Sequence, residues 1–246
     1  MKDYLYDGTF DGYLTAIFYA YAEKEEVGIY KESIYSPSLL STSQIILSES
    51  DKSDRVYQSI LSKLSHNTLD NLYKVFLSEA PDAETLGLYY LRLCYHYSDD
   101  INLAKNNDLI HKVDTLCKRV WLEVHRFYGF IRFKEISPMV FYAAIEPDHN
   151  ILPLIMGHFK KRFSDQHFII HDLKRKSAII YDTKNILLSY LTTEESDKLA
   201  KAEISDAFEE LFRTYYKSTT IKERYNPRLR NSFMPKRYYK HLVELE

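Results

Sequence analysis

The hydrophobic pattern of the chain changes at FIRFKEISPMVFYAAI, residues 130–145. Two runs rich in aromatic and β-branched residues, 130–136 and 140–145, flank Ser137-Pro138, which predicts two neighbouring antiparallel strands. Further along, residues 167–172 and 177–181 flank a short basic turn and predict a hairpin. The second half of the chain is therefore expected to contain a small antiparallel sheet of about four strands.

The region before this stretch is expected to be helical. Apolar residues recur at helical spacing from Asp11 onward and in four later segments, the last of which ends near Gly129. Short strands are expected at 4–6 and 44–47, and we expect the first of them to join the later sheet. A helix after Asp148 and another over 195–217 follow the central strands. This order predicts a mostly helical α+β protein.

Length and composition favour one compact globular domain. The 246 residues, 45% of them hydrophobic, are enough to bury a sizeable core. We expect a single domain over 1–246, which can be divided into a helical lobe, 11–128, and a sheet-plus-helix lobe, 129–246. No apolar run reaches the roughly 18 residues that a membrane span needs. The N-terminal residues contain no apolar h-region, so we expect no secretory leader. The predicted location is the cytoplasm, without membrane association.

Several kinds of cofactor site are not expected. Neither a glycine-rich dinucleotide-binding motif nor a P-loop occurs. Cys94 and Cys117 are the only cysteines, and both fall on apolar helix faces, which predicts buried thiols in a reducing compartment. The sequence therefore predicts no cofactor and no metal site. No recognised nucleophile motif occurs either, which leaves open whether the protein is an enzyme.

Positive charge is concentrated near the C-terminus. Residues 1–124 contain 12 basic and 19 acidic residues, whereas residues 125–246 contain 21 and 16. The segment 213–241 alone has nine basic residues and a single acidic residue, Glu223. The sign of the local charge, more than the total charge, controls attraction to a polyanion. This segment is therefore the strongest indication of a partner.

The stretch Glu146-Pro147-Asp148-His149 is one candidate for chemistry. It lies where a strand gives way to a helix, and exposed amides at a helix N-terminus attract anions. Glu146 and His149 could form an acid–base pair, with Asp148 beside them. The alternative, which we favour, is that Asp148 caps the helix and His149 is a surface residue. His125, at the end of the preceding long helix, is a further candidate acid–base group.

Basic residues interleaved with aromatic residues are the pattern that a nucleic-acid groove requires. Lysine and arginine contact phosphates, and aromatic faces stack on unpaired bases. Arg132, in the expected strand 130–136, should point away from the core and could hold a phosphate, although a cross-strand ion pair is equally consistent with its position. The candidate nucleic-acid-binding residues are Arg132, Lys160, Arg162, Arg175, Arg228, Lys236, Arg237 and Tyr238. The alternative is a solvated tail whose aromatic residues pack on the body of the protein.

Six motifs together resemble a bacterial family assigned to DNA metabolism or DNA repair, a domain of unknown function. They are YDGTFDG (6–12), HRFYGFIRF (125–133), EPDHNILPL (146–154), HFKKRF (158–163), NPRL (226–229) and MPKRY (234–238). Their order and spacing cover essentially the whole chain. The chain departs from the family pattern at Tyr239, where relatives often have tryptophan.

The resemblance implies a companion, a radical S-adenosylmethionine protein of DNA modification or repair. It also implies relatives fused to uracil-DNA-glycosylase-like domains, but it implies no reaction. Three hypotheses follow, in order of preference. The protein is a DNA-binding accessory factor for single-stranded or damaged DNA, a protein-interaction module for the radical enzyme, or an enzyme of glycosylase or hydrolase type acting on DNA or nucleotides.

Overall fold

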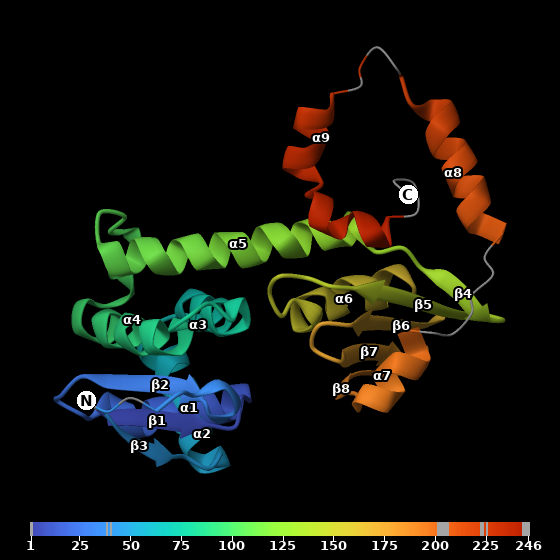
Figure 1. Cartoon of the computed structure of the whole chain (residues 1–246). Coiled ribbons are helices and arrows are strands. Elements are labelled where there is room, and N and C mark those ends of the chain that lie inside the picture. The colour runs from blue at the N-terminus through green and yellow to red at the C-terminus, as the bar shows by residue number, and fades with distance from the viewer. Residues whose placement is uncertain are drawn as a thin grey trace. The chain divides into compact units, whose positions relative to one another are not determined.

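The computed structural model describes residues 2–37, 39, 41–200, 207–221, 224 and 226–242. The chain forms two compact units, Met1–Trp121 and Leu122–Glu246, and the boundary between them falls inside one long helix, α5 (Asp108–Phe130). Figure 1 labels the elements along the chain. Each unit has its own sheet, which confirms the α+β class.

The first unit is built around a three-stranded parallel sheet. Its strands are β1 (Lys2–Tyr6), β2 (Val27–Lys31) and β3 (Thr42–Ile45), in the order β2-β1-β3. The expectation that the first strand joins the later sheet is wrong, because β1 pairs on both edges with strands of its own unit. Strand β2 has five residues and follows the charged run 23–26, so its apolar pattern was too short to predict a strand.

Helices cover this sheet and supply most of the core. They are α1 (Phe10–Tyr21), α2 (Ser50–Lys63), α3 (His66–Ser78) and α4 (Ala83–Tyr97), with the short 3-10 helices η1 (Glu32–Ile34) and η2 (Asp99–Leu103). Helices α1 and α4 pack on the sheet, and α2 packs on α1. Cys94 and Cys117 lie in a buried apolar cluster, where burial raises the pKa of Cys94 to about 11 and that of Cys117 to about 12.

The second unit contains a five-stranded sheet in sequential order. The strands are β4 (Lys134–Ser137), β5 (Val140–Ile145), β6 (His167–Asp172), β7 (Ser177–Tyr181) and β8 (Ile186–Tyr190). The predicted hairpin of β6 and β7 is confirmed. The sheet is mixed and not wholly antiparallel, because α6 (Leu152–Arg162) connects β5 to β6 as a crossover and leaves those two strands parallel.

Two boundaries differ from the sequence prediction. The helix α5 continues through Gly129 to Phe130, so β4 begins only at Lys134 and Arg132 lies in the connection between them. Helix α6 begins at Leu152 after Ile151, and Asp148 makes no capping bond. The proline at position 153 sits in the first turn of α6, where it needs no amide donor, and this fixes the later start.

The C-terminal part of the second unit consists of short helices. They are α7 (Thr193–Ala200), α8 (Ala207–Thr219), α9 (Pro227–Phe233) and the 3-10 helix η4 (Lys236–His241). The predicted helix over 195–217 includes residues 201–206, which lie outside the described residues, as do Lys222, Glu223 and Tyr225 of the basic segment. No helix among the described residues is long and apolar enough to cross a membrane.

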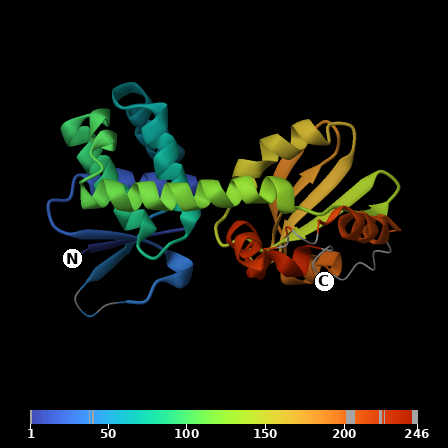
Figure 2. The ribbon, with the colours of Figure 1, turned by 90° about the horizontal axis from the view of Figure 1, so that it is seen from above.

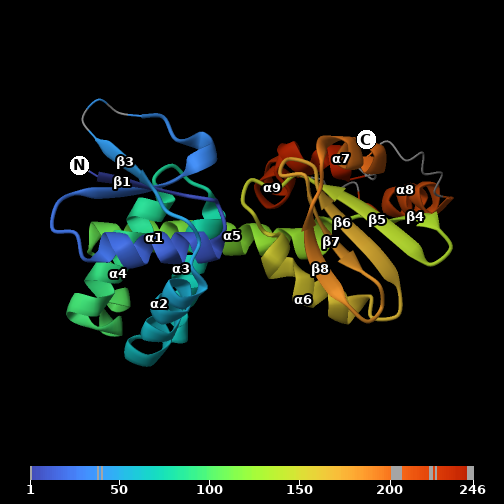
Figure 3. The same ribbon diagram turned by 90° about the horizontal axis from the view of Figure 1, so that it is seen from below.

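Helices α6 and α7 lie on opposite faces of the five-stranded sheet (Figure 3). Helix α6 runs along one face of the sheet, as Figure 2 shows from another direction. Its apolar side chains pack against Phe168 and Ile170 of β6. The residue after Ile170, His171, points to the other face, and its Nε2 lies 3.0 Å from Ser196 Oγ of α7. Because side chains alternate along β6, the sheet face toward α6 is apolar, whereas the face toward α7 includes the polar contact of His171 with Ser196.

Candidate nucleic-acid interface

A buried carboxylate on α5, Glu123, organises the surroundings of the 146–149 loop. Its side chain accepts hydrogen bonds from the backbone N–H groups of Asp148 and His149, each at 2.8 Å, and from the hydroxyl of Tyr238. Only 3% of Glu123 is exposed. The sequence prediction that these amides attract an external anion is therefore not supported, since an internal carboxylate already occupies two of them.

The loop is also held by cations. Arg237 pairs with Asp148 at 2.7 Å, and Lys240 pairs with Glu146. Arg237 and Asp148 are each about half exposed, so this ion pair contributes little to stability. Both carboxylates of the expected acid–base cluster thus have cationic partners. These two ion pairs connect the 146–149 loop to η4.

Arg175 supports the same loop from the β6–β7 turn. Its guanidinium donates to Asp172 Oδ2 at 2.8 Å, to the carbonyl oxygen of Pro147 at 3.1 Å and to that of Asp148 at 2.8 Å. The Asp172 side chain is fully buried, and burial raises its pKa although Arg175 lies beside it. Arg175 is therefore a positioning residue in this structure, with its side chain 10% exposed.

Tyr238 anchors the C-terminal segment. Its ring is 2% exposed and lies against Phe127 at 5.1 Å and Phe130 at 5.9 Å between ring centroids. Burial, followed by the hydrogen bond to Glu123, raises the pKa of its hydroxyl. The ring therefore offers no open face to a base, and it fixes η4 to the end of α5. The guanidinium of Arg237 lies 4.7 Å from this ring.

The remaining basic candidates are at the surface. Lys160 and Arg162 lie in the last turn of α6, Arg228 in α9 and Lys236 in η4. Arg162, Arg228 and Lys236 are exposed and Lys160 is partly exposed. Among the described residues, none of these four forms an ion pair with a carboxylate. They are the candidates whose charge remains available to an external polyanion.

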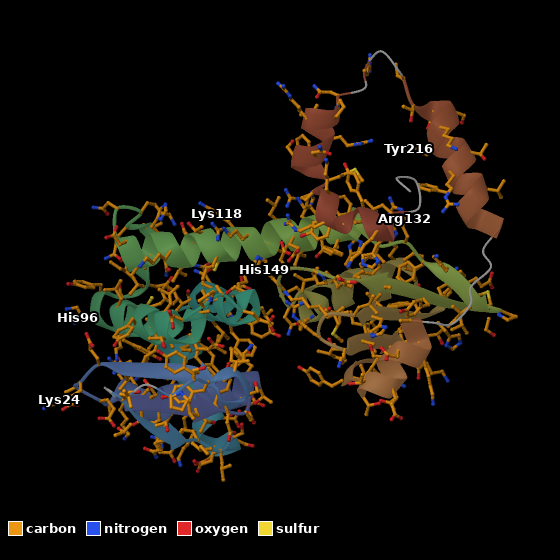
Figure 4. The ribbon with its side chains drawn as sticks, viewed as in Figure 1. Lys24, His96, Lys118, Arg132, His149 and Tyr216 are labelled. Carbon is orange, nitrogen blue, oxygen red and sulfur yellow. The ribbon has the colours of Figure 1, made fainter. Side chains whose placement is uncertain are left out.

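Arg132 and the histidines have different surroundings. Arg132 donates to the carbonyl oxygen of Gly129 at 2.6 Å, and its guanidinium lies 5.4 Å from the ring of Phe212 in α8. His125 is exposed, with its ring 6.5 Å from Tyr128. Figure 4 shows Arg132 and His149 at separate places on the unit.

The candidates do not converge on one cleft. Asp148 and His149 bond to Glu123 through their backbone amides, and Glu146 pairs with Lys240. Arg162, by contrast, ends α6, a helix that extends about 15 Å from its first residue to its last. A pocket of about 450 Å³ lies between α8 and α9, and Arg224 and Arg230 are among its lining residues, but none of the acid–base candidates line it. No group of three or more metal-binding side chains occurs among the described residues.

Two buried polar groups are not predicted by the sequence patterns. Glu123 lies three residues after Val120, which places it on the inward face of α5, so its position in the helical repeat was an available signal. The second group is Tyr142, His171 and Ser196, in which both ring nitrogens of His171 lie 3.0 Å from a hydroxyl. No local pattern predicts that group, because its members come from three separate elements.

Comparison with known proteins gives one family and no individual relative. No curated protein and no solved structure matches the chain significantly. The profile of one protein family, described as a domain of unknown function, DUF4130, matches residues 81–244, about two thirds of the chain. The matched region contains α4, α5 and all the elements of the second unit, including Glu123 and the residues it holds. The chain therefore belongs to the DUF4130 family.

Proposed function

We propose that the protein is a DNA-binding accessory factor that works with a radical S-adenosylmethionine enzyme in DNA repair or metabolism. The partner is what the resemblance of the six motifs implies, and one observation carries the DNA-binding part of the proposal. The second unit presents basic side chains, on α6, α9 and η4, that have no carboxylate partner among the described residues. Such cations bind a phosphate backbone by displacing its counterions.

Exposed aromatic residues accompany these cations. Tyr215 in α8 is 62% exposed and Phe233 in α9 is 68% exposed. Exposed rings near basic residues suit the stacking of unpaired bases, which favours single-stranded or damaged DNA over an intact duplex. The pocket between α8 and α9 adds hydroxyl, amide and guanidinium groups, a combination suited to phosphate.

The test is a DNA titration with charge-removing variants. Labelled single-stranded and duplex oligonucleotides are titrated at about 50 mM and 200 mM salt, and the dependence of affinity on salt is measured. The paired variants Lys160→Gln/Arg162→Gln and Arg228→Gln/Lys236→Gln should weaken binding. Each should also reduce the slope of log affinity against log salt, by about 0.7 for every phosphate of a single strand that the variant no longer neutralises.

The matched control is Lys24→Gln/Lys112→Gln, which removes two exposed lysines from the first unit. This control should bind DNA as the wild type does. An equal loss of affinity in all three variants would show that net charge alone attracts the DNA. Absence of binding to either DNA form at the lower salt concentration would contradict the proposal.

A protein-interaction module is the second candidate, and one surface favours it. Leu211 and Tyr215 of α8 are 63% and 62% exposed, one turn apart on the same helix face. Such a stripe suits docking of a partner protein. If docking is direct, Leu211→Ser/Tyr215→Ser should abolish co-purification with the radical enzyme, and nuclease treatment of the wild-type complex should not. Nuclease-sensitive co-purification would instead indicate that DNA bridges the two proteins.

A further inference from the structure

A second pocket lies wholly inside the first unit and shares no residue with the candidate nucleic-acid interface. It has a volume of about 780 Å³, within the range of about 300–1,000 Å³ typical of small-molecule sites. Its lining comes from α1, α2 and α4. Helix α1 packs against both α2 and α4. The pocket therefore lies over α1, beside the other two helices.

The two walls of the pocket differ in chemistry. Phe18 and Tyr21 of α1 and Tyr95 of α4 form an aromatic wall, and the buried side chains of Ile17 and Leu91 are its floor. The rings of Tyr21 and Tyr95 lie 5.5 Å apart at an angle of 80°. The Tyr21 side chain is 40% exposed. The wall thus offers aromatic surface to a planar ligand.

The opposite wall is a polar stripe on α2. Arg55, Ser59 and Lys63 follow one another at intervals of four residues and therefore share one helix face. The hydroxyl of Tyr95 donates to Ser59 Oγ at 2.8 Å and links the two walls. The guanidinium of Arg55 lies 5.1 Å from the ring of Phe18, beside the aromatic wall.

The charge of the lining is opposite to that of the unit. Residues 1–121 contain 18 acidic and 12 basic residues, yet both charged residues of the pocket, Arg55 and Lys63, are basic. Among the described residues, neither forms an ion pair with a carboxylate. A ligand that fits both walls has an aromatic ring and a negatively charged group.

We propose that this pocket binds a nucleoside 5′-monophosphate, with the base on the aromatic wall and the phosphate at Arg55. Lys63, about 12 Å farther along α2, adds to the positive potential. Gln58 and Ser62 of α2 also line the pocket and provide hydrogen-bonding groups for the sugar. This proposal is independent of DNA binding by the second unit.

Calorimetric titration of the full chain with the four deoxynucleoside 5′-monophosphates tests it. At least one should bind saturably, and the matching nucleoside and inorganic phosphate should each bind at least about tenfold more weakly, since each lacks one of the two recognised groups. Equal binding of nucleotide and nucleoside, or absence of binding by all four nucleotides, would overturn the proposal.

Variants locate the site. Arg55→Gln should weaken nucleotide binding by about tenfold, the effect of one charge-assisted hydrogen bond at an exposed position. Ser62→Glu adds a negative charge to the α2 wall of the pocket, which repels the phosphate. It should weaken nucleotide binding by at least as much as Arg55→Gln does. Lys112→Gln, at an exposed position outside the pocket, is the control. If Arg55→Gln and Ser62→Glu remain folded by circular dichroism and bind as Lys112→Gln does, the pocket is not the site.

Discussion

At the scale of single residues, Glu123 joins three parts of the second unit. Its buried carboxylate accepts hydrogen bonds from two backbone amides of the 146–149 loop and from the Tyr238 hydroxyl. A buried charge is tolerated only when such bonds satisfy it. The residue therefore connects α5, the 146–149 loop and η4 more firmly than the exposed ion pairs of the same region do.

This arrangement predicts unequal effects of two conservative substitutions. Glu123→Gln places an amide N–H₂ opposite a backbone donor and should reduce the free energy of unfolding by about 2–3 kcal/mol. Tyr238→Phe keeps the ring and removes only the hydroxyl, and should reduce the free energy of unfolding by about 1–2 kcal/mol. Chemical denaturation measures both. The control Asp165→Asn changes an exposed carboxylate and should have little effect. Equal stability of Glu123→Gln and wild type would contradict the assigned role.

His171 predicts a pH dependence of stability. Burial lowers the pKa of this imidazole in the folded protein. The unfolded chain therefore binds a proton more readily than the folded protein below the ordinary histidine pKa of about 6.5, so stability falls as pH decreases through that value. His158 and His241 also have pKa values lowered mainly by burial and add to the same trend.

The contribution of His171 can be separated by substitution. Unfolding free energies measured between about pH 7 and pH 5 should fall less steeply for His171→Gln than for wild type, because one of the three shifted groups is gone. Asn67→Gln, which changes an exposed side chain that does not titrate, should leave the slope unchanged. If the free energy of unfolding depends on pH equally in wild type and in His171→Gln, then His171 does not contribute to the pH dependence of stability.

At the scale of elements, the end of α5 determines where the second sheet begins. A glycine near a predicted helix end commonly marks a left-handed cap, but Gly129 has an ordinary helical position one residue before the end of α5. A Cβ at this position would meet no atom within 4 Å. Gly8, after β1, differs because its φ of +88° lies in the left-handed region.

Two alanine substitutions distinguish these glycines. Gly129→Ala should raise the free energy of unfolding by about 0.5 kcal/mol, since alanine loses less backbone entropy than glycine on joining a helix. Gly8→Ala should lower it by about 1 kcal/mol, because a side chain disfavours a positive φ. Thermal unfolding monitored by circular dichroism gives both. Destabilisation by Gly129→Ala would indicate that α5 ends earlier than it does in this structure.

At the scale of the whole molecule, the net charge changes sign close to the boundary between the two units. The unit Met1–Trp121 is acidic, whereas residues 122–246 contain 21 basic and 17 acidic residues. The family profile begins at residue 81, so β1–β3 and α1–α3 lie outside the matched region. The proposed functions follow this division. The second unit contains the basic surface that we propose for DNA, and the first contains the pocket that we propose for a nucleotide.

The sequence alone was sufficient for features with a local physical cause. The α+β class, the amphipathic helices and the β6–β7 hairpin follow from the spacing of apolar residues, which strands and helices impose over a few positions. Burial of Cys94 and Cys117 follows from the same spacing. The concentration of positive charge in residues 213–241 is likewise a property of the sequence.

Only the tertiary structure decided which groups meet. The parallel pairing of β1 with β2 and β3, the three bonds to Glu123 and the burial of Tyr238 join residues far apart in the chain. The basic neighbours of Tyr238 in the sequence predict a stacking surface, but the apolar end of α5 encloses its ring. Local composition specifies what a side chain can do. Solvent exposure and bonding partners, which depend on long-range packing, determine which of those roles remains open.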